Sequence, residues 1–352
     1  MKKILFFVVI LSLIFMGCKK DKEDKKDDEK QEEIITSEQK LIKIGLATNS
    51  VGVSDSTFIE MHYLGLLRVI EERIKDNNEN VVVTLKEVTD DTEEGYLETM
   101  EYLASEGECN MVITTGSFQA INPVNVLSKK YPEVKFVITD VTADDGNNVA
   151  ALLFDQYEGS FLAGVLAAKV TKTKKLGCIG GVNQNVINEF INGYKNGIEY
   201  VNSGIKVVVE YLSEPPDYSG FSNPDKGYSV AKNMYNKGVD IIYSPAGFST
   251  TGAIKCAADM EKFIIGTDAN LDYMAEGFVL TCMMKRVDNA IFDIVEKFLE
   301  DKFVGGTYIY SLNNGGISLT DMKYTKDKIT DEVIIYIKTM IDKIINNEIS
   351  IR

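Results

Sequence analysis

Two aspartates and one lysine follow closely on apolar stretches of the sequence. Asp140 ends the run KFVITD, Asp268 ends FIIGTD, and Lys285 comes shortly after the apolar stretch 278–282. Carboxylates at such positions are able to transfer protons or to accept hydrogen bonds from a ligand. Their placement predicts a polar ligand site where the chain brings these three ends together.

Motifs of the common enzyme classes are missing from the sequence. It contains no G-x-x-x-x-G-K-[ST] phosphate loop and no G-x-S-x-G nucleophile elbow. No single loop holds the compact acidic cluster that calcium or magnesium requires. The sole histidine, His62, falls inside an expected helix, where packing suits it better than base catalysis. We therefore expect a protein that is not an enzyme and that needs no metal or other cofactor.

The composition is that of an acidic globular protein. The 352 residues include 53 acidic and 38 basic side chains, for a formal net charge of -15, and 45% are hydrophobic. At roughly 150 residues per domain, this length accommodates two domains. The negative charge argues against a nucleic-acid-binding protein, which needs a positive surface.

The amino-terminal residues have the pattern of an export signal. Lys2 and Lys3 precede an apolar run that ends before Cys18, and the run is too short to span a bilayer. We expect residues 1–17 to be a signal peptide. The alternative is a secretory peptide that is cleaved without any modification of the cysteine.

A lipid anchor and a tether are expected to follow the signal. Phe15-Met16-Gly17-Cys18 is a loose match to a bacterial lipobox, which predicts a lipid such as palmitate on Cys18. The stretch 19–33 has no apolar residue and cannot offset the entropy of ordering. Residues 18–40 are therefore predicted to be a lipidated cysteine and a solvated tether, holding the protein at a membrane facing the periplasm or the cell exterior.

Four further cysteines lie far apart in the sequence and form no C-x-x-C pair, which makes zinc or thioredoxin-like chemistry improbable. Their surroundings are apolar or strand-like, and this favours buried free thiols over disulfides. The four are Cys109, Cys178, Cys256 and Cys282.

Short apolar runs predict ten strands, many of them apolar throughout, as in parallel sheets covered on both faces. The runs are 41–47, 81–88, 111–115, 135–139, 149–154, 175–180, 206–211, 240–244, 262–266 and 278–282.

Helical patterns lie between these runs. Residues 58–75 repeat apolar side chains at helical spacing, 161–170 is apolar enough to be a buried helix whose small residues allow close packing on a sheet, and 331–346 is amphipathic. Alternating strands and helices predict an α/β fold with two doubly covered parallel sheets, one in each of two Rossmann-like lobes.

Ligands of open α/β sheets bind beyond the carboxyl ends of the strands. This rule nominates six loops as walls of a cleft between the lobes. They are 48–58, 115–122, 140–145, 180–190, 243–252 and 267–271.

Seven sequence blocks, in order, resemble the basic membrane protein family of bacterial lipoproteins, which includes purine nucleoside receptors of spirochaetes. The blocks are IGLATNSVGVSDSTF, KFVITD, EGSFLAGVLAAKV, KLGCIGG, MYNKGVDIIYSPAG, FIIGTDAN and MMKRVDNAI. The resemblance spans about residues 44–322. It implies a type I periplasmic-binding-protein fold with three hinge crossovers, and a ligand held between the lobes for an ABC-type importer.

The resemblance also implies how a purine would be held. Phe58 matches the family phenylalanine that stacks on the base, with a core residue at the start of the helix as the alternative. The opposing ring is expected from Phe221, Tyr243 or Phe248, and Gly247 belongs to the same loop as the last of these.

Polar contacts to the base are expected from the first lobe. Asp140 matches a family aspartate that accepts hydrogen bonds from purine nitrogens, with a turn or cap as the alternative. Asn49 stands where many relatives have Asp, a change that alters the available donors. Ser50 and Ser117 are weaker candidates, and Asp55 is either a ligand contact or a helix cap.

At the sugar end, Asp268 matches the family aspartate that accepts from ribose hydroxyls, and Lys285 matches a lysine that contacts the sugar and its acidic neighbours. We therefore expect a monomeric, membrane-anchored binding protein for a purine nucleoside, with an ABC permease as partner. The alternatives are a sugar or autoinducer-type receptor on the same fold, or a surface adhesin or antigen.

The expected division of the chain has two lobes, each made of two segments. Residues 41–152 with about 270–305 are predicted to form the N-terminal lobe. Residues 153–269 with about 306–352 are predicted to form the C-terminal lobe.

Overall fold

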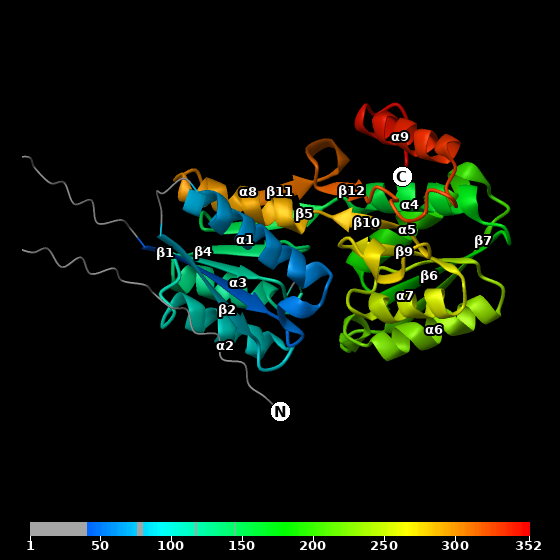
Figure 1. Cartoon of the computed structure of the whole chain (residues 1–352). Helices are drawn as coiled ribbons and strands as arrows, with labels where there is room; N and C mark the ends of the chain where they lie inside the picture. Colours follow the sequence, from blue (N-terminus) through cyan, green and yellow to red (C-terminus); the bar gives the residue numbers. More distant parts are fainter. Residues whose placement is uncertain (1–40, 76–79, 117, 145) are drawn as a thin grey trace, which may run out of the picture. The chain divides into compact units, whose positions relative to one another are not determined.

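The computed structural model describes residues 41–75, 80–116, 118–144 and 146–352. The expected signal peptide, Cys18 and the tether over 18–40 lie outside the described residues. Two β-sheets of six strands each form the centres of two lobes, with helices on both faces of each sheet (Figure 1). This arrangement confirms the predicted α/β class and its two lobes.

The first sheet contains only parallel neighbours. Its strands, in spatial order, are β11 (Gly306–Tyr310), β5 (Val149–Phe154), β4 (Lys135–Thr139), β3 (Met111–Thr114), β1 (Leu41–Thr48) and β2 (Asn80–Glu87).

The second sheet repeats this order but ends on an antiparallel strand, which pairs with β10. Its strands are β12 (Ile317–Leu319), β10 (Val279–Lys285), β9 (Phe263–Asp268), β8 (Ile241–Tyr243), β6 (Lys175–Val182) and β7 (Lys206–Ser213). All ten strands predicted from apolar runs are present, whereas β11 and β12 are additional strands that the apolar runs do not predict.

Two helices cover each face of each sheet, and those that share a face pack against each other. In the first lobe the pairs are α1 (Phe58–Lys75) with α8 (Val287–Leu299), and α2 (Glu93–Ala104) with α3 (Ile121–Lys130). In the second lobe they are α4 (Gln156–Val170) with α5 (Asn185–Val201), and α6 (Pro224–Asn236) with α7 (Ser249–Asp259).

Shorter elements complete the lobes. The carboxyl-terminal helix α9 (Asp331–Ile345) packs on α4, as its amphipathic pattern predicts. The 3₁₀ turns are η1 (Gly52–Ser54), η2 (Ser219–Phe221), η3 (Asp272–Ala275) and η4 (Leu312–Asn314). Turn η1 lies between Asn49 and Asp55, and turn η2 contains Phe221; all three are predicted site residues.

The strands are apolar on both sides because each side faces a helix layer. In β3, Met111 and Ile113 belong to the larger apolar cluster, which also contains residues of α1 and α8, while Val112 belongs to the cluster that contains residues of α2 and α3. Successive side chains of a strand point to opposite faces. A run without polar residues is therefore what a doubly covered strand requires.

Helix α4 packs on the strands β10 and β12 of the sheet, as its small residues predict, and it also approaches α5 very closely. A Cβ added to Gly164 would lie 2.1 Å from the carbonyl oxygen of Tyr194, and one added to Gly197 would lie 2.0 Å from that of Phe161. Any larger side chain at these positions would force the two backbones apart. Glycines on both helices thus set the distance between them.

The chain passes between the lobes three times, at Asp155, at Arg286 and over residues 311–316. The predicted segment boundaries need correction at the second and third of these crossings. The range 270–305 was assigned to the N-terminal lobe, but β10 lies in the second sheet. The range 306–352 was assigned to the C-terminal lobe, but β11 lies in the first sheet. Strand partners are non-local, so the order of the runs does not reveal them.

All four cysteines of the lobes are buried and free, which confirms the prediction from their apolar surroundings. Burial raises the pKa of the Cys109 and Cys256 thiols to about 11. Such thiols stay protonated and unreactive at neutral pH. Among the helices that the structure describes, none is both long and apolar enough to cross a membrane.

Candidate functional site

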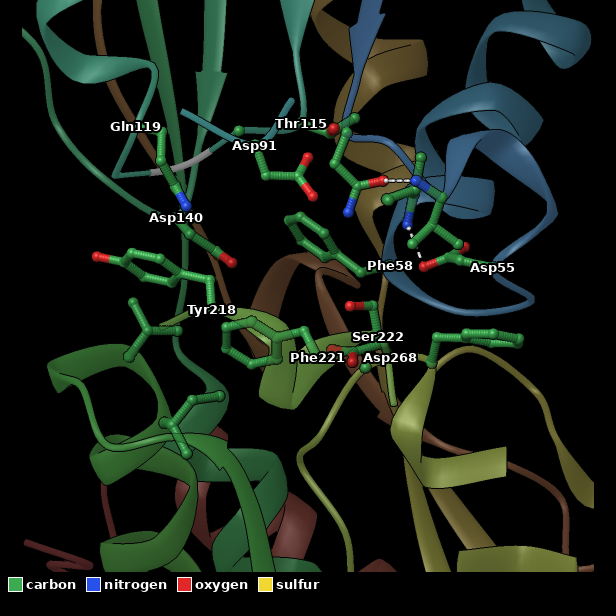
Figure 2. A pocket seen from close by; sticks show the side chains of 18 of the residues that line it. Asp55, Phe58, Asp91, Thr115, Gln119, Asp140, Tyr218, Phe221, Ser222 and Asp268 are labelled. Carbon is green, nitrogen blue, oxygen red and sulfur yellow. Dashed lines mark hydrogen bonds between the residues drawn. The ribbon is translucent and has the colours of Figure 1, made fainter. Parts of the chain in front are cut away.

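A cavity lies where the carboxyl ends of strands from both sheets face each other (Figure 2). It encloses about 970 Å³ of space outside protein atoms, open solvent at its mouth included. The predicted site residues that line it are Asn49, Asp55, Phe58, Asp140, Phe221, Gly247, Phe248, Asp268 and Lys285. Residues separated by more than two hundred positions therefore meet at the edge that the strand-end rule nominates.

Phe58 is the first residue of α1, and its position depends on the carboxylate of Asp55. Both oxygens of Asp55 accept hydrogen bonds from the start of the helix: Oδ1 from the N–H groups of Thr57 (3.0 Å) and Glu60 (2.9 Å), Oδ2 from the Ile59 N–H (3.1 Å) and the Thr57 hydroxyl (2.6 Å). Asp55 thus lines the cavity and caps the helix, and the cap engages its oxygens.

His62 holds the backbone of Phe58 in place through a hydrogen bond. Its Nδ1 lies 2.9 Å from the Phe58 carbonyl and its Nε2 lies 3.0 Å from the Thr139 hydroxyl. Because a carbonyl only accepts, Nδ1 carries the hydrogen and Nε2 accepts from Thr139. Burial lowers the pKa of His62 to about 4, so the ring is neutral at pH 7. The histidine therefore serves packing, as expected, and links α1 to the end of β4.

Phe221, the last residue of η2, approaches the cavity from the second lobe, and glycines make room for its ring. A Cβ on Gly181 would lie 2.4 Å from the Phe221 ring. Gly247 adopts a φ of +54°, and a Cβ there would lie 3.2 Å from the Phe221 carbonyl oxygen. Figure 2 shows the rings of Phe58 and Phe221 on opposite sides of the cavity.

Lys285 is the central cation of the site. It is only 1% exposed and pairs with Asp140 of the other lobe. Its Nζ lies 5.1 Å from the centre of the Phe58 ring, 5.2 Å from that of Phe154 and 5.5 Å from that of Phe190. Aromatic faces at this distance attract a cation. The rings and the carboxylate together provide the ammonium group with favourable contacts in a buried position.

Asp268 lies close to this ion pair and is also buried. Burial raises its pKa to about 6, although Lys285 favours the ionised form; the negative charges of Asp140 and Asp55 add to the rise. Its Oδ2 accepts from the Thr267 hydroxyl at 3.3 Å. Oxygens of Asp140 and Asp268 thus remain available as acceptors for a ligand.

Tyr243, one of the expected stacking rings, does not line the cavity. It is fully buried, its hydroxyl lies 2.8 Å from that of Ser160, and its ring packs 4.9 Å from Tyr194. Side chains alternate along β8, and Tyr243 faces α4 and α5 instead of the strand end. Its assignment to the site is therefore wrong.

The two serines of the prediction have different outcomes. Ser50 does not line the cavity, because its N–H and hydroxyl donate to Asp91, at 2.9 Å and 2.7 Å. Its role is to position that carboxylate. Ser117 lies outside the described residues.

Several lining residues are absent from the prediction, among them Asp91, Tyr96, Gln119, Gln184, Phe190, Tyr218 and Ser222. Asp91 follows β2 and Tyr218 follows β7, which are equivalent strands of the two sheets. Neither loop is among the six nominated above, yet the same strand-end rule applies to both. Gln119, Gln184 and Phe190 lie within nominated loops.

The lining chemistry favours a flat, neutral ligand that donates hydrogen bonds. Asp55, Asp91, Asp140 and Asp268 are the carboxylates of the described lining, and Lys285 is its cation. Charged side chains that accept hydrogen bonds therefore outnumber charged side chains that donate them in this lining. No group of His, Cys, Asp or Glu within the described ranges is arranged to hold a metal ion.

A family model described as "ABC transporter substrate-binding protein PnrA-like" matches residues 42–352. The ABC transporter nucleoside-binding protein BmpA of Lactococcus lactis subsp. cremoris is 31% identical over 296 residues, 79% of this chain and 81% of that protein. Basic membrane protein A1 of Borrelia garinii subsp. bavariensis is 29% identical over 356 aligned positions, 99% of this chain and 96% of that protein.

Solved structures share the fold. An ABC transporter solute-binding protein from Aeropyrum pernix K1 superposes with a TM-score of 0.76 at 24% identity, covering 88% of this chain and 92% of that one. With the two sheets and three crossovers, this likeness confirms the type I periplasmic-binding-protein fold that the sequence blocks imply.

Proposed function

The chain belongs to the Bmp family of PnrA-like substrate-binding proteins of ABC transporters, and we propose that it binds a purine nucleoside in the cavity between its lobes for delivery to an ABC permease. A substrate-binding protein is not an enzyme: it captures a solute and presents it unchanged. The alternative classes kept open by the sequence differ in the solute or in the partner, and the cavity chemistry distinguishes them.

The observation that carries the proposal is the pair of phenylalanines at the cavity. Phe58 and Phe221 come from different lobes and lie on opposite sides of the space (Figure 2). A purine has two π-faces, and stacking on aromatic rings is worth roughly 1–3 kcal/mol per base. Phe248 also lines the cavity and adds to its apolar surface. A sugar alone would leave much of this aromatic surface without a flat partner.

The polar end of the cavity suits a ribose. Asp268 and the Asp140–Lys285 pair lie together where β9, β10 and β4 end. Hydroxyls donate to carboxylates through charge-assisted bonds, which are stronger than neutral ones. A free base would leave these groups without partners, and buried polar groups left unpaired cost affinity. This supports a nucleoside over a base.

Delivery would depend on closure of the cavity. Ligand contacts from both lobes stabilise the closed arrangement more than the open one, which shifts the population toward closure. The three crossovers are the segments about which such a motion would occur. A closed monomer would present a permease with a surface that the open form lacks.

Attachment to a membrane is part of the same proposal. A relative that aligns with 99% of this chain is named a basic membrane protein, and Cys18 precedes a stretch without apolar residues. We infer a lipid on Cys18 that anchors the protein. Metabolic labelling with a palmitate analogue, compared between wild type and Cys18→Ala, tests this; equal labelling of both would contradict it.

The function is tested with the purified protein in two steps. Native mass spectrometry would identify any copurifying ligand, and calorimetry would measure adenosine, guanosine, inosine, adenine and ribose. We expect the nucleosides to bind more tightly than adenine or ribose. Binding of ribose with no response to any nucleoside would replace the proposal with a sugar receptor, and binding of nothing would favour the adhesin alternative.

A further inference from the structure

Asp91 differs from the other carboxylates of the described cavity lining in that it neither caps a helix, as Asp55 does, nor lies beside Lys285, as Asp140 and Asp268 do. Its Oδ1 accepts from the Ser50 N–H at 2.9 Å and its Oδ2 from the Ser50 hydroxyl at 2.7 Å. An ionised carboxylate has about four accepting positions, so each oxygen keeps one. No lysine or arginine of the described chain forms an ion pair with Asp91. Ser50 thus holds the Asp91 carboxylate in place, and the carboxylate can still accept hydrogen bonds from a ligand.

The remaining carboxylates of the described lining have other neighbours. Asp55 uses its oxygens to cap α1. Asp140 is paired with Lys285, and Asp268 lies in the field of the same lysine. Both lie at the end of the cavity that we assign to the ribose, so the ion pair with Lys285 places Asp140 near the sugar instead of the base contact that the resemblance implies. Asp91, in the loop after β2, is thus the carboxylate placed to read the base, and it lines the same cavity as Phe58 (Figure 2).

Asn49 supplies a donor next to this acceptor. Its Oδ1 accepts from the Val51 N–H at 3.0 Å, which fixes the orientation of the amide, since only an oxygen accepts from an N–H. The Nδ2 hydrogens have no partner among the described residues. Asn49 lines the cavity and directly precedes Ser50, the residue that holds Asp91. The pair therefore presents one donor beside two acceptors.

We propose that Asn49 and Asp91 read the Watson–Crick edge of guanine, so that the protein prefers guanosine; this rests on the proposed nucleoside function. Guanine offers an acceptor, O6, followed by two donors, N1–H and the N2 amino group. The Asn49 amide donates to O6, and the two Asp91 oxygens accept from N1 and N2. A bidentate pair of this kind is both strong and geometrically selective.

Other purines fail at defined atoms of this edge. Hypoxanthine keeps O6 and N1–H but lacks the amino group, so it loses one bond to Asp91. Adenine turns the N1 lone pair toward the carboxylate, and xanthine turns O2 toward it. An acceptor facing a fixed carboxylate is repelled, and such repulsion contributes to specificity as much as attraction does. The predicted order of affinity is guanosine, then inosine, then adenosine and xanthosine.

The experiment is calorimetric titration of the four nucleosides into wild type, Asp91→Asn and the control Asp90→Asn. Asp90 is the adjacent residue, is exposed and does not line the cavity. A good bidentate contact is worth roughly a five- to hundredfold discrimination between bases. Asp91→Asn should therefore lose about that factor for guanosine. The variant should bind adenosine more tightly than wild type does, because an amide can donate to N1 where the carboxylate repels it. Asp90→Asn should match wild type.

Two results would overturn the inference while leaving the proposed function intact: equal affinity of wild type for guanosine, inosine and xanthosine, or an equal loss for all nucleosides in Asp91→Asn. The second would mean that Asp91 only supports the loop. Melting curves of each variant would separate that outcome from misfolding. Failure of wild type to bind any nucleoside would instead remove the proposed function, and the inference with it.

Discussion

Asp140 and Asp268 occupy equivalent positions in the two lobes and share the same unusual backbone conformation. Each stands at the end of the third strand of its sheet, β4 or β9, and each has a φ of 70°. A left-handed φ is uncommon for residues other than glycine and is found at functional sites, where the surrounding structure enforces it. Both carboxylates lie near the buried Lys285. The cavity is thus built from one motif used twice, around one cation.

Replacing Phe58 by alanine should weaken nucleoside binding by about ten- to hundredfold, because one stacking face for the base is lost. His62 and Asp55 hold the start of α1 independently of this ring, so the melting temperature of the ligand-free protein should change by only a few degrees. Calorimetry measures the affinity. Phe303→Ala, a half-buried phenylalanine that does not line the cavity, is the control, and unchanged affinity in Phe58→Ala would remove this residue from the site.

Tyr243→Phe should destabilise the protein without affecting the ligand. The substitution removes the hydroxyl that is hydrogen-bonded to Ser160 and leaves that serine without its partner. A buried hydrogen bond of this kind contributes about 1 kcal/mol to the free energy of unfolding. Chemical denaturation measures that loss, and titration with guanosine should give the wild-type affinity. Weaker binding at unchanged stability would return Tyr243 to the site.

Nucleoside binding should tighten as the pH rises through about 6. Ribose hydroxyls donate to the ionised form of Asp268, whose pKa burial raises to about 6. Below that pH the carboxyl must lose a proton before it can accept both bonds, so affinity should fall by up to tenfold per pH unit. Calorimetry at pH 5 and pH 7.5 tests this. The Asp268→Asn variant should bind weakly at both values, with a much smaller dependence on pH.

The same carboxyl should affect stability in the opposite direction. A pKa raised above its unfolded value stabilises the folded state at low pH, and this contribution is lost as the pH rises through 6. Ligand-free Asp268→Asn should therefore be more stable than wild type at pH 7.5, by on the order of 2 kcal/mol, and nearly equal to it at pH 4. Denaturant titrations at the two pH values measure the difference. Greater stability of wild type at pH 7.5 would contradict the buried, uncompensated character of this group.

Nucleoside monophosphates should bind at least thirtyfold more weakly than the corresponding nucleosides. Among the described residues that line the cavity, four are aspartates and one is a lysine, which is already paired. Two like charges about 8 Å apart repel by roughly 2 kcal/mol at an effective dielectric constant of about 20. The comparison is guanosine, 5′-O-methylguanosine and guanosine monophosphate at two salt concentrations. If the neutral methyl ether binds as poorly as the nucleotide, size rather than charge explains the loss.

Local patterns predicted much of the fold. The bounds of α1 and β5 agree with the apolar periodicity of 58–75 and the run 149–154, because burial imposes a repeat that each short segment carries within itself. Strands β11 and β12 lack a continuous run of buried apolar residues. The first is half exposed along its length and the second has three residues, so edge strands of this kind need their partners to be recognised.

The site follows the same division. Asp140, Asp268, Lys285 and Phe58 were identified from strand ends and sequence blocks, and the structure brings them to one cavity. Asp91 was missed only because the loop after β2 was not nominated. Tyr243 was misplaced because its side chain packs against α4 and α5, whereas the cavity is lined by residues beyond the end of β8, such as Pro245 and Phe248.

Apolar periodicity was therefore enough to predict the α/β class, two lobes and the buried thiols, and the strand-end rule together with the sequence blocks predicted some of the cavity residues. Which sheet receives β10 and β11, how Ser50 holds Asp91, and that Lys285 pairs with an aspartate of the other lobe became evident only in the tertiary structure. Each of these depends on contacts between residues far apart in the chain. The spacing of apolar residues within one segment indicates its secondary structure, whereas a binding site forms where separate segments meet.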